Sequence, residues 1–167
     1  MNDSKFDHST LWDLIKDIRF GMLTHRHHDG MLYSHPLTTQ NNSLDEVSTL
    51  YFFIFEKSEL ASSLRQDGNV NVSYTSPNDD RYVSIVGKAR VTQDPDTVEQ
   101  LWSSAAQDWF PDGPTDPDLA LLTVEIIHSE YWDAEESRMK QLFNMAKAAL
   151  TGEQRPHLSG HKEVNMT

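Results

Sequence analysis

A dipeptide with a strong turn preference, Asp29-Gly30, separates two β-like runs, Phe20–His27 and Met31–Thr38. A turn that joins two strands this closely needs positive φ angles, which glycine adopts without steric cost. The arrangement predicts a tight hairpin in which the two runs pair directly. The sequence therefore predicts that the first part of the chain forms an antiparallel pair of strands.

Further strand-like runs follow, and most are joined by turns. They are Thr49–Phe55, Asn69–Thr75, Arg81–Thr92, Leu119–His128 and the short Tyr131–Asp133. The first of these is almost wholly apolar, which indicates burial on both faces. The turn Ser76–Asp80 predicts a second hairpin between its neighbours. The sequence thus predicts a mainly β protein with peripheral helices, built as an antiparallel barrel.

Four helices are predicted beside these strands. Ser9 and Thr10 can cap a helix over residues 11–18, and Ser58 can cap a second helix over residues 59–66. A third helix begins at Asp94 and Pro95 and runs to about Gln107. The last helix is predicted over residues 138–150. The length of 167 residues fits one domain. We place this domain at residues 1–150 and expect a flexible C-terminal tail at residues 151–167.

The chain is acidic, and its negative charge is unevenly distributed. Lys and Arg number 14 against 26 Asp and Glu, and 12 of these acidic residues lie between Val91 and Ser137, where Lys and Arg are absent. Such a chain repels phosphate backbones and anionic lipids, so we expect no nucleic-acid and no membrane partner. The absence of cysteine excludes disulfides and thiolate chemistry. With neither a signal peptide nor a membrane span visible, we expect a cytoplasmic protein.

Histidines gather in the first hairpin, at His25, His27, His28 and His35. His25 and His27 share one strand face, so a metal site is one interpretation. No carboxylate stands at a diagnostic spacing and no zinc motif is present, so an exposed hairpin without metal is preferred. The sequence also lacks a serine-hydrolase elbow and a glycine-rich phosphate loop.

Two aromatic residues, Trp109 and Phe110, open a loop that three prolines keep irregular. Such side chains either pack into the core or cover a flat ligand by stacking. Composition alone favours packing in the core.

Eight segments of the chain follow one another in the order typical of a known family. They are residues 18–24, 34–40, 50–53, 80–90, 101–102, 109–111, 130–133 and 141–148. In these segments the chain resembles the general-stress-protein branch of the pyridoxamine 5′-phosphate oxidase-like, FMN-binding split-barrel family. The resemblance covers roughly residues 10–150 and implies an antiparallel six-stranded split β-barrel.

The resemblance also implies a homodimer that holds FMN, a small-molecule flavin, in a groove between two barrels. In the family, the flavin ring lies along the strand that here contains His35, Pro36, Leu37, Thr38 and Gln40. The phosphate end lies at positions matching Phe53, Ile54, Ser58, Glu59 and Leu60. Tyr82 matches a position near the ring, and Trp109 one near the pocket, where it would form a lid. No catalytic residue is assigned.

The chain departs from the family where the phosphate is bound. Relatives commonly carry Arg-x-Arg-Pro where this sequence has Tyr33-Ser34-His35-Pro36, Thr-Ser at Ile54-Phe55, and Ser-x-Lys at Ser58-Glu59-Leu60. Charge-assisted hydrogen bonds are about twice as strong as neutral ones, so their loss weakens the expected affinity. A protonated His35, Lys57, Arg65 or Arg81 could substitute for the missing cations. Restoring one cation by Leu60→Lys is expected to tighten FMN binding by about an order of magnitude.

Two functions follow from these observations. The first is a flavin-binding protein with a redox or general-stress role, which as an enzyme would be an FMN-dependent oxidoreductase. Oxidation of pyridoxamine phosphate is not expected, because the chain lacks the C-terminal segment with which true oxidases of that substrate grip it. The alternative is a degenerate, non-catalytic dimeric split barrel that has lost FMN phosphate binding or binds another flat ligand. A haem or deazaflavin binder, suggested by the histidine-rich hairpin, is a third interpretation.

Overall fold

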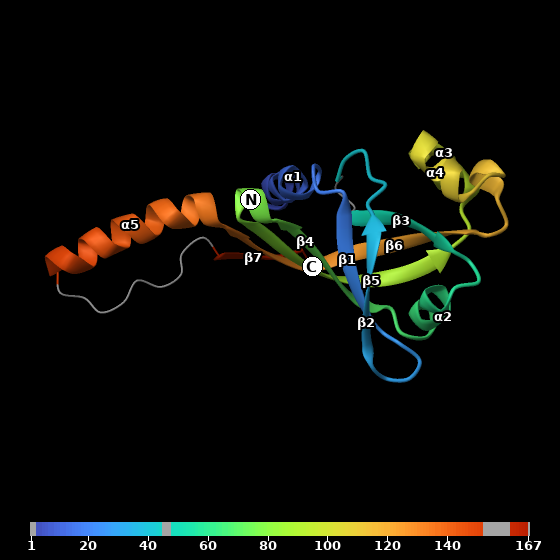
Figure 1. The fold of residues 1–167 in the computed structure, drawn as a ribbon, viewed down its shortest axis with the longest axis horizontal. Coiled ribbons are helices and arrows are strands. Elements are labelled where there is room, and N and C mark those ends of the chain that lie inside the picture. Colours follow the sequence, from blue (N-terminus) through green and yellow to red (C-terminus); the bar gives the residue numbers. More distant parts are fainter. Residues whose placement is uncertain (1–2, 45–47, 152–160, 167) are drawn as a thin grey trace.

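The computed structural model describes residues 3–44, 48–151 and 161–166, and its centre is one antiparallel sheet that curls into a split barrel (Figure 1). The strands are β1 (Phe20–Arg26), β2 (Leu32–Thr38), β3 (Thr49–Phe55), β4 (Asn69–Ser76), β5 (Arg81–Thr92), β6 (Leu119–Asp133) and β7 (His161–Asn165). Their order is β2-β1-β4-β5-β6-β3, and β7 also pairs with β6. The prediction of a mainly antiparallel β fold is confirmed.

The first hairpin forms as its turn residues predict. Gly30 has a φ of +85°, and its N–H donates to the His27 carbonyl at 2.9 Å. The resulting register places Met22 opposite Pro36 and Leu23 opposite His35. Because side chains alternate between the two faces of a strand, this register fixes which residues of β2 face the barrel interior.

The barrel is split between β2 and β3, the two ends of the strand order. These strands contact each other but form no ladder in the described part of the chain. Gln40, just past β2, donates its backbone N–H to the carbonyl of Tyr51 in β3 at 2.8 Å. Two edge strands thus face each other along the split.

Two hydrophobic cores flank β3. Leu50, Phe52 and Ile54 are buried in the main core inside the barrel. Tyr51 and Phe53 point the other way and pack against a smaller core formed by Val98, Phe110, Leu119 and Leu121. This arrangement explains the almost continuous apolar character of β3, because both faces of the strand are covered.

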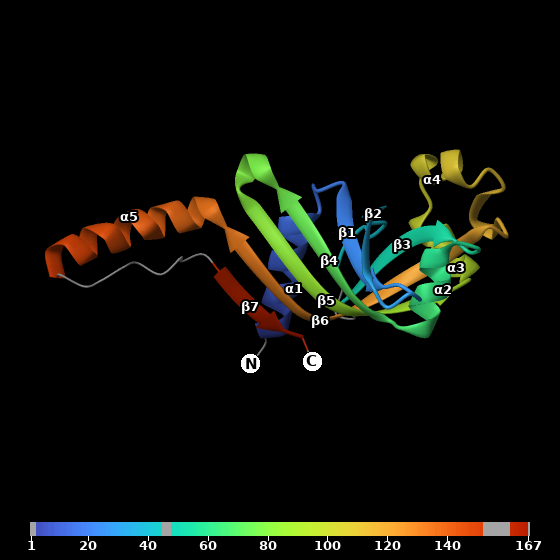
Figure 2. The same cartoon turned by 60° about the horizontal axis from the view of Figure 1, so that its bottom comes forward.

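The helices lie around the barrel rather than between its strands. They are α1 (Asp3–Ile15), α2 (Glu59–Gln66), α3 (Pro95–Leu101), α4 (Ser104–Trp109) and α5 (Ala134–Thr151), with short 3₁₀ turns at Pro77–Asp79 and Gly113–Thr115. In Figures 1 and 2, α5 projects from one end of the molecule, while α2, α3 and α4 lie at the other. Among the described residues, no helix is both long and apolar enough to cross a membrane.

Two predicted helices differ from the structure. Ser9 and Thr10 lie inside α1 and do not cap it, because the helix begins at Asp3. The single helix predicted from Pro95 to Gln107 is two helices, since the backbone is extended at Trp102 and Ser103. Trp102 packs against Phe53 at this break, with ring centroids 5.8 Å apart.

The C-terminal region also differs from the prediction. The two strand segments predicted near residues 119–133 form one continuous strand, β6. Residues 161–165, predicted as part of a flexible tail, form β7 and pair with residues 128–132 of β6. Figure 2 shows β7 beside β6. Residues 152–160 of the predicted tail lie outside the described residues.

Candidate functional site

All but two of the predicted site residues lie around the split between β2 and β3. His35, Pro36, Leu37 and Thr38 belong to β2, Gln40 follows it, Phe53 and Ile54 belong to β3, and Ser58, Glu59 and Leu60 begin α2. The chain reaches α2 directly from β3, with only Glu56, Lys57 and Ser58 between the two elements. The split and the start of α2 therefore form one continuous region.

The residues of β2 alternate between the two faces of the sheet. Pro36 and Thr38 are exposed on the outer face, whereas His35 and Leu37 are half-buried and point into the barrel. Thr39, the next residue, hydrogen-bonds the hydroxyl of Tyr74 in the core at 2.5 Å. Burial raises the pKa of Tyr74 to about 12, so its hydroxyl stays protonated. This contact anchors the end of β2 to the barrel interior.

The histidines of the first hairpin form a cluster that reaches into the barrel. His25 is only 1% exposed, and neither of its ring nitrogens has a hydrogen-bond partner among the described residues. His35 stacks on it with ring centroids 5.2 Å apart, and His27 lies edge-on at 5.7 Å. The prediction of an exposed hairpin is therefore wrong for His25, because the alternation of β1 points this side chain inward.

Burial sets the charge of this cluster. Desolvation, followed by the charges of His35 and His27, lowers the pKa of His25. Desolvation and the charge of His27 also lower the pKa of His35. A protonated His35 is therefore a poor substitute for the missing cations. In the described residues, no group of three or more His, Asp or Glu side chains is arranged to hold a metal ion.

The start of α2 is held by its own capping residue. The Ser58 hydroxyl accepts a hydrogen bond from the Ala61 N–H at 3.1 Å and donates one to the Phe55 carbonyl at 2.6 Å. The cap predicted at Ser58 is confirmed. Because its single proton is engaged with Phe55, Ser58 cannot donate to an anion without breaking this turn.

The other residues of the predicted phosphate end carry no positive charge into it. Leu60 is 8% exposed and Ile54 4% exposed, and both belong to the main core. Arg65 forms an ion pair with Glu56 at 2.5 Å. Glu59 is exposed, and its carboxylate lies 3.6 Å from Nε2 of His27. The position where the resemblance implies a cation is thus a buried leucine, and the residue before it is an exposed carboxylate.

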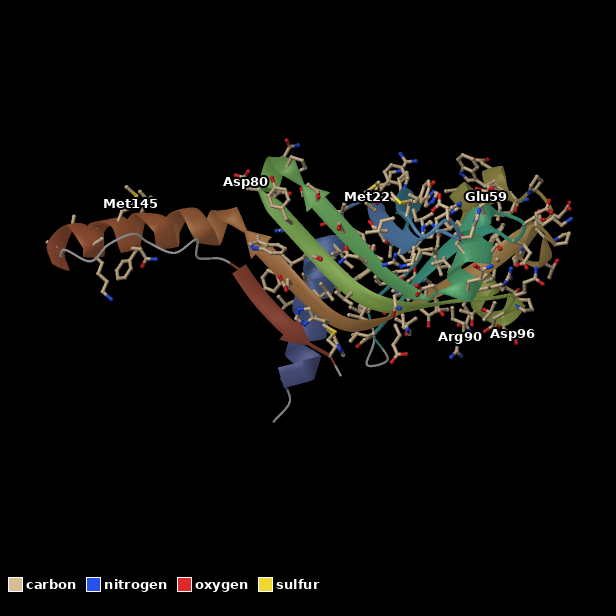
Figure 3. The ribbon with its side chains drawn as sticks, turned by 90° about the horizontal axis from the view of Figure 1, so that it is seen from below. Met22, Glu59, Asp80, Arg90, Asp96 and Met145 are labelled. Atoms are coloured by element: carbon tan, nitrogen blue, oxygen red, sulfur yellow. The ribbon has the colours of Figure 1, made fainter. Side chains whose placement is uncertain are left out.

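Tyr82 lies far from the start of α2, and Trp109 is exposed. The backbone N–H of Ala89 in β5 donates to the carbonyl of Gly68, just after α2. Tyr82 lies seven residues from Ala89 along β5, which at roughly 3.3 Å per residue separates the two residues by about 23 Å. In Figure 3, the neighbouring Asp80 and Glu59 are at opposite ends of the sheet. Trp109 is 70% exposed at the end of α4, whereas Phe110 is buried in the smaller core. The expectation of core packing is thus met by Phe110 alone.

A carboxylate beside β2 was missed by the sequence reasoning. The hydroxyl of Tyr33 donates to Asp29 at 2.6 Å, and the backbone N–H of Met31 donates to the same carboxylate at 2.8 Å. The bond from Tyr33 is the main reason that the pKa of Asp29 is lowered, so this group is ionised at neutral pH. The predicted hairpin register could have shown this contact, because Tyr33 follows the turn closely.

The sequence profile described as pyridoxamine 5′-phosphate oxidase like matches residues 7–156. The chain belongs to this family. General stress protein 26 of Bacillus subtilis (strain 168) is 39% identical to it over 46 residues, a match that covers 28% of this chain and 32% of that protein. The chain thus spans about a third of the length of this curated relative.

Solved structures of family members share the fold. A candidate general stress protein 26 from Jannaschia sp. CCS1 is 25% identical, with a TM-score of 0.69, and the match covers 99% of both chains. The general stress FMN/FAD binding protein of Xanthomonas citri is 30% identical, with a TM-score of 0.66, over 78% of this chain and 90% of that one. The family and the general-stress branch predicted from the sequence are confirmed, and so is the split-barrel fold.

Proposed function

We propose that this protein binds a flavin in the split between β2 and β3, as a homodimer, in a redox or general-stress role. The observation that carries the proposal is that the family profile spans residues 7–156, which contain the whole split. The Xanthomonas citri relative, named as an FMN/FAD binding protein, supports the same ligand class. FMN is the form that the sequence resemblance implies.

The split suits the ring of a flavin. Edge strands can present backbone N–H and C=O groups to a ligand, and β2 and β3 are both edge strands here, with Tyr51 of β3 already bonded to Gln40 and Asn41. Pro36, exposed on the outer face, offers apolar contact beside those groups. A bound flavin would supply hydride or electron transfer. The residues of this chain would hold the ring and exclude water from one of its faces.

The phosphate end does not suit FMN equally well. Phosphate is normally held by Arg or Lys together with hydroxyls and backbone N–H groups. Here Leu60 is buried, the Ser58 proton is engaged, and Glu59 adds a negative charge. The proposal therefore rests on the ring-binding end of the site.

A second copy of the chain would complete the site. Tyr82 lies far from α2 in its own barrel, as its position on β5 shows. On the outer face of the sheet, Phe20, Met22, Tyr82 and Val86 are exposed. Large exposed apolar surfaces of this kind mark interaction sites. Pairing of two such faces would cover them and is the basis for the homodimer in the proposal.

The alternative is a non-catalytic dimer that has lost flavin binding. It is favoured by one observation, the burial of Leu60 in the core at the position where relatives carry lysine. The two functions share a fold and differ in the ligand.

A visible spectrum of protein purified without added cofactor tests the proposal, followed by fluorescence titration with FMN and with riboflavin. We expect a flavin band or saturable quenching by at least one flavin, and weaker binding after Thr38→Trp, which places a large side chain at the split. Gln100→Trp, at an exposed position on α3, is the matched control and is expected to bind normally. A colourless protein that ignores both flavins at about 100 µM contradicts flavin binding and favours the non-catalytic dimer.

A further inference from the structure

The charges at the start of α2 are the opposite of those that a phosphate needs. None of the predicted site residues is Lys or Arg. The Glu59 side chain is 79% exposed and extends toward the first hairpin, where it lies 3.6 Å from His27. Asp29 adds a second carboxylate on the same hairpin, beside Tyr33. Both carboxylates accept hydrogen bonds and repel anions.

Three neutral groups near the start of α2 that could receive an anion are engaged elsewhere. The Ser58 hydroxyl donates to Phe55, and the Ala61 N–H donates to Ser58. Ser63 is hydrogen-bonded to Nδ1 of His27 at 3.3 Å. A phosphate that used these groups would break bonds that connect α2 to the hairpin and to the end of β3.

Two basic side chains near α2, Arg65 and Arg26, have acidic partners, whereas Lys57, one residue before Ser58, is exposed. Arg65, in the last turn of α2, is paired with Glu56. Arg26, on β1, donates to the Gly30 carbonyl at 2.9 Å and lies 3.8 Å from Asp67. A phosphate would compete with these carboxylates for each guanidinium.

We propose that the site selects a flavin without a phosphate group, such as riboflavin, over FMN. This inference rests on the proposed flavin-binding function and names its ligand class. Glu59 is the selecting residue: its carboxylate accepts a hydrogen bond from a hydroxyl of the ribityl chain and repels the phosphate dianion of FMN. Riboflavin carries the same ring and the same chain, so the two ligands differ only in the group that meets this charge.

Paired titrations with riboflavin and FMN test the proposal on the full chain, with flavin fluorescence as the readout. We expect riboflavin to bind at least as tightly as FMN. The Glu59→Lys variant is expected to tighten FMN binding about tenfold and to change riboflavin binding less than about threefold, because one charge-assisted contact replaces one repulsion. Added salt is expected to strengthen FMN binding to the native protein, since it screens the repulsion.

Glu99→Lys on α3 is the matched control, because it makes the same charge change at an exposed position away from the split. It is expected to leave both affinities within about twofold of the native values, as surface charges at that distance are screened. The milder Glu59→Gln removes the negative charge without adding a cation, and it is expected to tighten FMN binding by less than Glu59→Lys does.

The outcomes separate the two proposals. If native protein binds FMN more tightly than riboflavin, the phosphate is favourably held and the selection is refuted, while the flavin function stands. If Glu59→Lys leaves FMN affinity unchanged, the assignment of Glu59 is refuted in the same way. If neither flavin binds, the proposed function fails and the selection fails with it.

Discussion

Replacing His25 by leucine is expected to stabilise the protein. The ring is 1% exposed, and neither nitrogen has a hydrogen-bond partner among the described residues. An unsatisfied buried polar group costs about 1–3 kcal/mol, and an apolar side chain of similar size removes that cost. We therefore expect His25→Leu to raise the free energy of unfolding by about 1–3 kcal/mol at neutral pH. For a chain of this length, each kcal/mol raises Tm by about 2–4 °C.

The advantage of leucine is expected to grow in acid. Because burial lowers the pKa of His25, the folded protein binds its proton less readily than the unfolded chain, whose histidines titrate near pH 6.5. As the pH falls below about 6.5, the unfolded state gains protons first, so the native protein loses up to about 1.4 kcal/mol per pH unit for this group until the folded pKa is passed. The pKa of His35 is also lowered, so the variant still loses the stability that protonation of His35 costs in acid.

Urea unfolding followed by tryptophan fluorescence at pH 7.5 and pH 5.5 measures both effects. The control is His28→Leu, the same change at an exposed position of the hairpin, where we expect a difference within about 0.5 kcal/mol. A His25→Leu variant less stable than the native protein at both pH values would show that the imidazole is satisfied in solution, and would refute the reasoning.

Two further predictions concern neighbouring side chains and the predicted phosphate end. Phe110→Ala is expected to cost about 3–5 kcal/mol and Trp109→Ala less than about 0.5 kcal/mol in urea unfolding, because only Phe110 is buried; equal costs would contradict the division between them. Leu60→Lys is expected to lower stability at least as much as the roughly 2–5 kcal/mol of a buried Leu→Ala change, since an ammonium would enter the core. Its Tm and FMN affinity should be measured together, and tighter binding at an unchanged Tm would restore the expectation drawn from the sequence.

The parts of the fold that sequence predicted are those set by local chemistry. Asp29-Gly30 specifies the first hairpin, and the resulting register follows from side-chain alternation. Ser58 caps α2 as expected, since a serine at this position bonds a backbone N–H of the first turn. The break between α3 and α4 could not be predicted in this way. It depends on Trp102 meeting Phe53, a contact between segments far apart in the chain.

The candidate site shows the same division. The resemblance located the residues around the split, because motif order survives where individual side chains change. It could not show which way each side chain points. Leu60 faces the main core, and Phe53 faces the smaller one, so neither is free to line an open groove. The separation of Tyr82 from α2 is equally invisible in the sequence, since it follows from the length and direction of β5.

The pairing of β6 has a consequence for how the chain avoids aggregation. One edge of β6 is covered by β5, and the other is shared by β3 over residues 119–125 and β7 over residues 128–132. An uncovered strand edge is a template for pairing with another chain. Residues 161–165 therefore cover the second half of β6, and a chain without them would expose this edge to pairing with another chain.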